Sequence, residues 1–296
     1  RCAAKAGQKM ERHEPEKKKR NSFTATVLCE HKTSTPPGDF RYHMHNEFEI
    51  FFFVQGDVSY IVEQQVYTLL PGDILLFNNT EFHYPTFRSN AEFERIVLHF
   101  DPTVAQQFST PRTPLLHRFL SRPQGEQNLV RLAPCERERF RALALSIEQE
   151  SQSGRTGDDV LAAAHLSELL VLLARAPQAQ PQAGRLSPYV RQALSYINAA
   201  LPQPISLAEV GRALSVDRFY LEKTFKKETG TTVYHYVLLK RLNLARVLLA
   251  QGCRVDETCA GAGFNDYSNF IRTFKKHTGM TPAAFARASQ SGCGGS

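Results

Sequence analysis

The chain has 296 residues, 42% of them hydrophobic, and a formal net charge of +7. Its length is about twice that of a typical domain, which predicts two domains. No apolar run approaches the roughly 20 residues that a membrane-spanning helix requires, and no signal-like apolar stretch opens the chain. The composition therefore argues against a membrane protein and predicts a cytoplasmic one without a membrane partner.

The positive charge is concentrated at the two ends of the chain. Residues 1–20 hold eight Lys and Arg against three Asp and Glu, residues 21–184 hold 13 against 19, and residues 185–296 hold 15 against seven. A basic C-terminal unit attached to an acidic body indicates that this unit binds a polyanion. The six cysteines are scattered without a Cys-x-x-Cys pair, which fits neither a zinc site nor a disulfide framework.

Both termini have the composition of disordered segments. Residues 1–21 are rich in charge and almost free of large apolar side chains, and residues 289–296 form a tail rich in Gly and Ser. We expect a disordered basic tail at one end and a disordered tail at the other. A basic arm that touches nucleic acid is the alternative for the first segment.

Residues 22–112 have the pattern of short antiparallel strands. Segments rich in β-branched and aromatic residues are separated by turn-forming residues such as Pro71-Gly72-Asp73. The expected strands are residues 48–54, 58–62, 66–69 and 74–77. Strands of this length at regular spacing predict an antiparallel barrel or sandwich.

The apolar period becomes helical in residues 113–176. One predicted helix carries Phe140, Leu143 and Ile147 at three- and four-residue spacing. A second begins at Asp158, and its apolar side consists of Leu161, His165, Leu166, Leu169, Leu170 and Leu173. This segment is either core or the seam of a homodimer, and one helix can serve both purposes. Residues 177–184 contain two prolines but no apolar period, so they form the predicted linker.

The basic C-terminal unit contains an internal repeat. Residues 221–230 align with residues 270–279 at a constant offset of 49, and both copies contain the string Phe-Lys-Lys-x-Thr-Gly. In each copy two apolar residues four apart share a buried helix face, Lys223 or Arg272 projects outward, and a glycine ends the helix. A second short helix and a tight turn precede each copy, and residues 233–249 form the helix that joins the halves.

A helix, a turn and a helix with a basic outer face form the geometry that places one helix in the major groove of DNA. The alternative is a small helical bundle with a solvated basic face. The repeat, with the same basic spacing twice, favours DNA binding.

The C-terminal residues also resemble a known family. The stretch 188–287 resembles the DNA-binding domain of the AraC/XylS family of bacterial regulators, through motifs such as Leu221-x3-Phe225-Lys226, Arg241-Leu242, Gly263-Phe264-x-Asp266, Phe274-Lys275-Lys276 and Thr281-Pro282. The resemblance implies an all-α domain at residues 185–288 with helix-turn-helix units at about 205–226 and 255–276. It also implies that the chain is not an enzyme but a transcription activator that binds double-stranded promoter DNA as a homodimer and contacts RNA polymerase. Thr258, Gly211 and Gly261 depart from the family pattern and are expected to weaken the supporting helices.

The resemblance assigns DNA-contacting roles by position. The base-reading residues are expected to be Arg218, Phe219, Glu222, Lys223, Ser268, Asn269 and Arg272. Arg272 has the donor geometry for guanine and Asn269 has that for adenine. Lys226, Lys227, Lys275 and Lys276 are expected to contact phosphates, which gives affinity and salt dependence but not specificity.

The N-terminal segment carries a cluster of histidines. Gly38, His43, His45, Glu49 and Gly56 have the spacing of the first metal motif of cupin barrels, and Pro71-Gly72-Asp73 with His83 resembles the second. If a metal is bound, its ligands would be His43, His45, Glu49 and His83, with Zn²⁺, Fe²⁺ or Mn²⁺ as candidates. That hypothesis leads to a metal-dependent oxygenase or isomerase.

The sensor domains of AraC/XylS regulators contain a comparable His-x-His-x3-Glu string, so the resemblance favours a cupin-like effector pocket without a metal or cofactor. The expected pocket residues are His43, His45, Glu49, Phe52, Tyr60 and His83, with Phe48 and Phe77 as further walls and Arg95 and His99 as additional candidates. The effector would be a small polar molecule such as a sugar. A purely structural role of the histidines in the barrel wall is the other alternative.

The sequence thus predicts an α+β protein with a cupin-like sensor at residues 22–112, a helical dimerisation segment at 113–176, and a double helix-turn-helix domain. Its predicted function is that of a ligand-responsive transcription regulator, in which effector and DNA change each other's affinity by the same factor. Two alternatives are a metal-dependent cupin enzyme fused to a DNA-binding domain and an architectural DNA-binding protein with a vestigial barrel.

Overall fold

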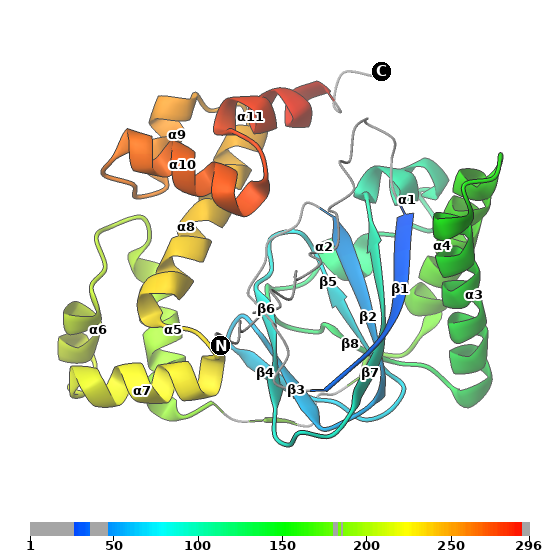
Figure 1. The fold of residues 1–296 in the computed structure, drawn as a ribbon, viewed down its shortest axis with the longest axis horizontal. Helices are drawn as coiled ribbons and strands as arrows, with labels where there is room; N and C mark the ends of the chain where they lie inside the picture. Colours follow the sequence, from blue (N-terminus) through cyan, green and yellow to red (C-terminus); the bar gives the residue numbers. More distant parts are fainter. Residues whose placement is uncertain (1–26, 36–46, 180–182, 185, 292–296) are drawn as a thin grey trace, which may run out of the picture.

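The computed structural model describes residues 27–35, 47–179, 183–184 and 186–291. The chain forms a β-domain flanked by helices and an all-helical C-terminal domain (Figure 1), which confirms the predicted α+β class. Residues 1–21 and 292–296 of the predicted tails lie outside the described residues. Ser289 to Ser291 belong to the last helix, so the predicted C-terminal tail is wrong at these three positions. None of the helices in the described ranges is long and apolar enough to cross a membrane.

The N-terminal domain is built from two antiparallel sheets. One has the strand order β1-β7-β2-β5-β8, and the other has the order β6-β3-β4-β9. Apolar side chains from both sheets meet between them, among them Phe51, Tyr60 and Phe77. The strands are β1 (Val27–Ser34), β2 (Phe48–Gln55), β3 (Val58–Val62), β4 (Gln65–Thr68), β5 (Asp73–Phe77), β6 (His83–Phe87), β7 (Phe93–Phe100), β8 (Leu129–Arg131) and β9 (Ala183–Gly184).

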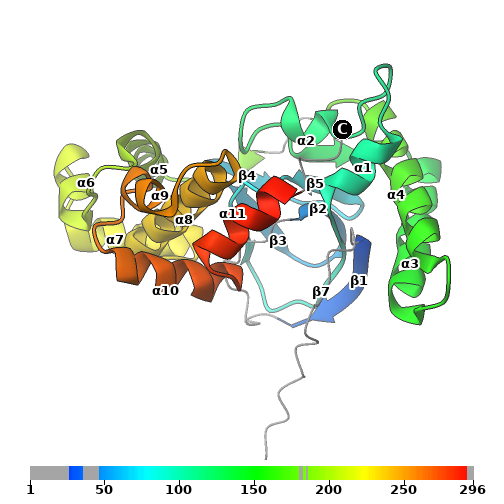
Figure 2. The ribbon, with the colours of Figure 1, turned by 90° about the horizontal axis from the view of Figure 1, so that it is seen from above.

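Four helices follow the main strands, namely α1 (Pro102–Phe108), α2 (His117–Leu120), α3 (Pro134–Ser153) and α4 (Asp158–Arg175). Helices α3 and α4 cover the outer face of the first sheet, on the side of the barrel away from the C-terminal helices (Figures 1 and 2). Phe140, Leu143 and Ile147 of α3 are buried against this sheet together with the leucines of α4, as their spacing predicts. Leu161 is the exception, because it is 49% exposed although the sequence places it on the apolar side.

The predicted linker has regular structure at its end. Ala183 and Gly184 form β9, which pairs with Val66 and Tyr67 of β4, and Gln178 forms a bridge with Val130 of β8. The chain is therefore attached to the barrel at both ends of this segment before it enters the C-terminal domain. Backbone hydrogen bonding of this kind leaves no trace in an apolar period, so the composition alone indicates an irregular linker.

The C-terminal domain contains two helical cores that share one helix. The first half of α8 contributes Val233, Tyr236 and Val237 to one core, and its second half contributes Leu242 and Leu249 to the other. Each core is completed by one helix-turn-helix unit. The helices are α5 (Pro188–Ala200), α6 (Leu207–Ala213), α7 (Arg218–Thr229), α8 (Val233–Ala250), α9 (Val255–Gly261), α10 (Tyr267–Thr278) and α11 (Pro282–Ser291).

Glycines allow the close turns of both units. A Cβ atom on Gly211 of α6 would lie 2.9 Å from the carbonyl oxygen of Val216, so the residue that looks unfavourable for a helix lets the turn pass close to it. Gly263 has φ +82°, and a Cβ atom there would lie 2.1 Å from the carbonyl oxygen of Pro202. Any larger residue would have to move backbone atoms at either position.

The replacement of Thr258 by valine is expected to raise the free energy of unfolding by about 1 kcal/mol. Thr258 of α9 is fully buried, and its hydroxyl has no hydrogen-bond partner in the described part of the chain, so the hydroxyl is desolvated without compensation. Valine keeps the shape of the side chain and has a similar helix propensity. Denaturant unfolding followed by circular dichroism measures the change.

Thr229 provides a matched control for this substitution. It is 1% exposed, but its hydroxyl donates to the carbonyl oxygen of Phe225 at 2.7 Å. Thr229→Val is therefore expected to destabilise the domain by about 1 kcal/mol. Equal effects of the two substitutions would contradict the assignment of an uncompensated hydroxyl to Thr258.

Candidate nucleic-acid interface and ligand pocket

Helices α7 and α10 are equivalent elements of the two helix-turn-helix units. The side chain of Asp217 caps α7 by accepting from the backbone N–H groups of Phe219 and Tyr220 at 3.0 Å, and Asp266 caps α10 by accepting from the N–H of Asn269 at 2.8 Å. Both helices end at a glycine with positive φ. The same start and end signals therefore produce two helices of 12 residues each.

The two helices bury one face and expose the other. Leu221, Phe225, Phe270 and Phe274 are fully buried. All the residues that the sequence assigns to DNA contact are exposed, apart from the half-buried Glu222 and Asn269; the exposed ones are Arg218, Phe219, Lys223, Lys226, Lys227, Ser268, Arg272, Lys275 and Lys276. The helices thus present a basic outer face with six exposed Lys and Arg side chains in the repeated part. Lys223 lies at the position of α7 that Arg272 occupies in α10.

The exposed face of α10 is partly ordered by its own side chains. The guanidinium of Arg272 donates to the side-chain oxygen of Asn269 at 3.1 Å, and the hydroxyl of Thr273 lies 3.3 Å from the same oxygen. On α7 the guanidinium of Arg218 lies 4.6 Å from the ring centre of Phe219. Asn269 therefore positions Arg272 in the free protein, in addition to its predicted role toward adenine.

One exposed residue of this face is absent from the sequence-based assignment. Tyr267, the first residue of α10, is 51% exposed and corresponds to Arg218 at the offset of 49. Extending the offset of 49 upstream of the repeat would have indicated Tyr267, because it equates the first residues of both helices. An exposed tyrosine at the start of a recognition helix can contact a phosphate or a base edge.

A polar cluster lies inside the barrel. The Glu49 carboxylate of β2 lies 3.2 Å from Nε2 of His83 on β6 and 3.2 Å from Nε2 of His99 on β7. The ring of Phe77 stacks on His83 with a centroid distance of 3.8 Å, and Tyr60 lies beyond it. Burial, and then the charge of Glu49, raise the pKa of Tyr60 well above its usual value of 10.0, so its hydroxyl stays neutral. His99 thus joins Glu49, Tyr60 and His83 in one group.

Phe52 does not belong to this group, which corrects the sequence-based assignment. Successive residues of a strand face opposite sides, and Phe52 is an odd number of residues from Glu49. Its ring stacks on Phe140 of α3 at 5.2 Å, on the helix-covered face of the sheet. Phe48 faces the same way and packs on Phe119. Phe51 takes the interior position instead, 4.6 Å from Tyr60.

His43 and His45 lie outside the described residues. Within the described ranges, no group of three or more His, Cys, Asp or Glu side chains has an arrangement that could hold a metal ion. Glu49 offers a single carboxylate oxygen to both His83 and His99, and these contacts form a hydrogen-bonding set. Glu49, His83 and His99 thus place hydrogen-bonding groups beside the aromatic rings of Tyr60 and Phe77.

The barrel and the C-terminal domain meet along helix α8 (Figure 1). Lys240 of α8 forms an ion pair of 2.7 Å with Glu63, and both side chains are nearly buried. The side-chain amide of Asn243 donates to the carbonyl oxygen of Thr80 at 2.7 Å, and Arg246 donates to that of Asn79 at 3.2 Å. Phe82 packs into the second helical core. No sequence pattern predicts these contacts.

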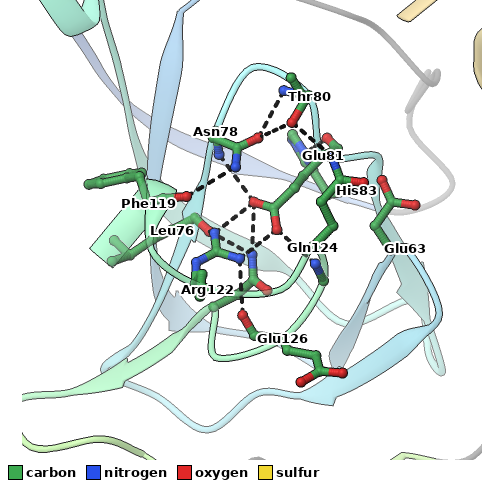
Figure 3. Close-up of polar contacts among 12 residues, drawn as sticks. Glu63, Leu76, Asn78, Thr80, Glu81, His83, Phe119, Arg122, Gln124 and Glu126 are labelled. Carbon is green, nitrogen blue, oxygen red and sulfur yellow. Dashed lines mark hydrogen bonds and ion pairs between the residues drawn. The ribbon is translucent and has the colours of Figure 1, made fainter. Parts of the chain in front are cut away.

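A buried ion pair between Glu81 and Arg122 stabilises the loop of residues 78–82, which contacts α8 (Figure 3). The Glu81 carboxylate accepts from Arg122 at 2.5 and 2.7 Å, from the N–H of Gly125 at 2.8 Å and from the amide of Asn128 at 3.2 Å. The Glu81 side chain is 0% exposed and that of Arg122 is 3% exposed. The carbonyl oxygen of Glu81 also lies 3.2 Å from Nδ1 of His83, so this loop connects the barrel interior with α8.

Comparison with known proteins agrees with this architecture. The family model of the AraC-like ligand binding domain matches residues 31–170, and that of a helix-turn-helix domain matches residues 210–288. The transcriptional activator RhrA of Rhizobium meliloti is 31% identical over 149 residues, which are 48% of this chain and 45% of RhrA. The transcriptional regulator Rob of Salmonella typhimurium is 29% identical over 102 residues, 34% of this chain and 35% of Rob.

One similar solved structure is that of ToxT from Vibrio cholerae bound to (E)-4-(8-methylnaphthalen-1-yl)but-3-enoic acid. It is 13% identical to this chain, and the TM-score is 0.37. The match covers 90% of this chain and all of the ToxT chain. The chain spans about a third of the length of Rob and less than half of that of RhrA. The two family matches occupy most of the chain, one on each domain. The chain belongs to the AraC family of transcriptional regulators.

Proposed function

We propose that this protein is a sequence-specific DNA-binding transcription regulator that acts in the cytoplasm and responds to a small molecule bound in its barrel. The observation that carries the proposal is the pair of equivalent helices α7 and α10. Each presents exposed basic side chains from a buried aromatic core, and the two are joined by the shared helix α8. Two such helices suit successive major grooves on one face of a duplex.

The interior of the barrel supports a small polar effector, such as a sugar. Glu49, Tyr60, His83 and His99 supply hydrogen-bonding groups beside the rings of Phe51 and Phe77. A few convergent polar groups on an aromatic wall are typical of ligand sites. The loop from Asn78 to Phe82 then offers a route to the DNA-binding domain, because it touches His83 on one side and α8 on the other.

The helical segment supports a homodimer. Leu145 of α3 is 38% exposed, and Val160 and Leu161 of α4 are 65% and 49% exposed. These apolar side chains lie on the elements that are farthest from the C-terminal domain (Figure 1). A dimer formed through them leaves all recognition helices accessible, and it would activate transcription by contact with RNA polymerase.

The proposal is tested by selecting sites for the full chain from random double-stranded DNA and measuring affinity for selected and scrambled sites at fixed salt. We expect the selected site to be bound at least ~1,000-fold more tightly than the scrambled one. A variant with both Lys223→Ala and Arg272→Ala should lose this preference, whereas Arg139→Ala on α3 should keep it. Equal binding of all sequences would instead support an architectural protein and contradict the proposal.

A further inference from the structure

A pocket of about 370 Å³ lies outside the barrel, where α2, the loop before it and the end of α4 meet. Its lining includes the four basic residues Arg112, His117, Arg118 and Arg122, and within the described ranges it contains no Asp or Glu. Ala174 at the end of α4 and Gln178 at the start of the linker form part of the wall. The volume lies in the range of sites for small ligands.

The charge of this pocket is only partly compensated. Glu81 neutralises Arg122 from behind the pocket. No carboxylate of the described residues forms an ion pair with Arg112 or Arg118. The guanidinium of Arg118 is half-buried, and the one hydrogen bond that the described residues give it is donated to the carbonyl oxygen of Ala176. Burial lowers the pKa of Arg118 from its usual value, which reflects the cost of a desolvated cation.

A bound anion would remove this cost. A guanidinium presents a planar set of N–H donors that matches two oxygens of a carboxylate or phosphate, and such charge-assisted hydrogen bonds are among the strongest in proteins. Arg112 and His117 are exposed and add two further donors to the lining of the same pocket. The pocket therefore combines a partly buried cation, two accessible donors and sufficient volume.

We propose that this pocket is a second ligand site, which binds a small anionic molecule with a carboxylate or phosphate group through Arg112, His117 and Arg118. The site is separate from the Glu49, His83 and His99 group inside the barrel. Its position also connects it to the DNA-binding domain. Arg118 holds Ala176 immediately before the linker, and Arg122 holds Glu81 in the loop that contacts α8.

Binding is tested with inorganic phosphate and with citrate as separate probes, by calorimetric titration of the full chain. We expect one anion per chain from at least one probe, and the probe that binds identifies phosphate or carboxylate as the preferred group. Arg112→Ala should weaken this binding by at least ~10-fold, because one charge-assisted hydrogen bond contributes about that factor. His117→Ala should weaken it as well, and both residues are exposed, so their replacement preserves the fold.

Two controls separate this site from the basic DNA-binding face. Arg191→Ala on α5 removes an exposed arginine elsewhere, and the variant with Lys223→Ala and Arg272→Ala removes cations from α7 and α10. Both should retain the binding of the probe. If neither probe bound stoichiometrically, the proposed site would be wrong. It would also be wrong if Arg112→Ala bound the probe as tightly as the unsubstituted chain.

The link to DNA binding rests on the proposed function and has its own measurement. At constant ionic strength, a saturating concentration of the probe that binds should change the affinity of the full chain for its selected DNA site by at least ~5-fold. The Arg112→Ala variant should show no such change. Anion binding without an effect on DNA affinity would refute the coupling alone. Failure of the proposed function would be recognised separately, because specific DNA binding would then be absent without any probe.

Discussion

Replacing Arg122 with alanine is expected to lower the free energy of unfolding of the N-terminal domain by about 3–5 kcal/mol. The substitution leaves the Glu81 carboxylate, whose side chain is 0% exposed, without its counter-charge. Arg122 also donates to the carbonyl oxygen of Arg118 at 2.8 Å and to those of Leu76 and Glu126 at 3.0 Å, so three carbonyls lose a partner as well. Urea unfolding followed by circular dichroism gives the magnitude.

The surface pair Arg139–Glu168 provides the control for this prediction. Its side chains are 64% and 38% exposed, so Arg139→Ala is expected to cost at most about 1 kcal/mol. Adding Glu81→Gln to the Arg122→Ala variant should recover part of the lost stability, because the buried negative charge is then removed. A loss no larger for Arg122→Ala than for Arg139→Ala would contradict the interpretation of Glu81–Arg122 as a buried ion pair.

Replacing Arg272 with alanine is expected to weaken binding to the selected DNA site by about 10- to 100-fold and to relax sequence preference at one base position. A bidentate contact between arginine and guanine accounts for about 1–3 kcal/mol of discrimination. Arg272 is exposed on α10 and is oriented by Asn269 at 3.1 Å, so the free protein already presents it outward. A repeat of the site selection with the variant, together with direct affinity measurements, tests both parts.

Lys276→Ala, on the same helix, separates base reading from phosphate contact. Lys276 is exposed in the last turn of α10. Its loss should weaken binding to all sequences by a similar factor and lower the slope of log affinity against log salt by about one. If Arg272→Ala also weakened all sequences equally, Arg272 would be a phosphate contact rather than a base-reading residue.

The sequence predicts the DNA-binding helices well because local signals define them. Asp217 and Asp266 cap their starts, a glycine ends each one, and the apolar residues keep a spacing of four. The sequence also predicts the start of α4 at Asp158, because Gly157 precedes two acidic residues that favour a helix N-terminus.

The differences from the sequence-based expectations have two causes. The assignment of Phe52 to the pocket overlooks the alternation along β2, which places Glu49 and Phe52 on opposite faces of the strand. The other differences depend on contacts that no local pattern indicates. Leu161 follows the helical period of the apolar side of α4, yet its side chain is 49% exposed. The ion pair between Glu63 and Lys240 joins residues 177 positions apart, and neither residue belongs to a pattern that indicates the other.

Helix α8 determines the spacing of the two helix-turn-helix units and also makes the contacts with the barrel. Its 18 residues correspond to a rigid rod of about 27 Å, and both helix-turn-helix cores are built directly on it. The spacing of the two helix-turn-helix units is therefore set by this one helix and by the packing of both cores on it. The barrel instead holds Lys240, Asn243 and Arg246, which follow one another along a single stripe of the rod. A change in these contacts would therefore move both helix-turn-helix units together, and the spacing between α7 and α10 would stay constant.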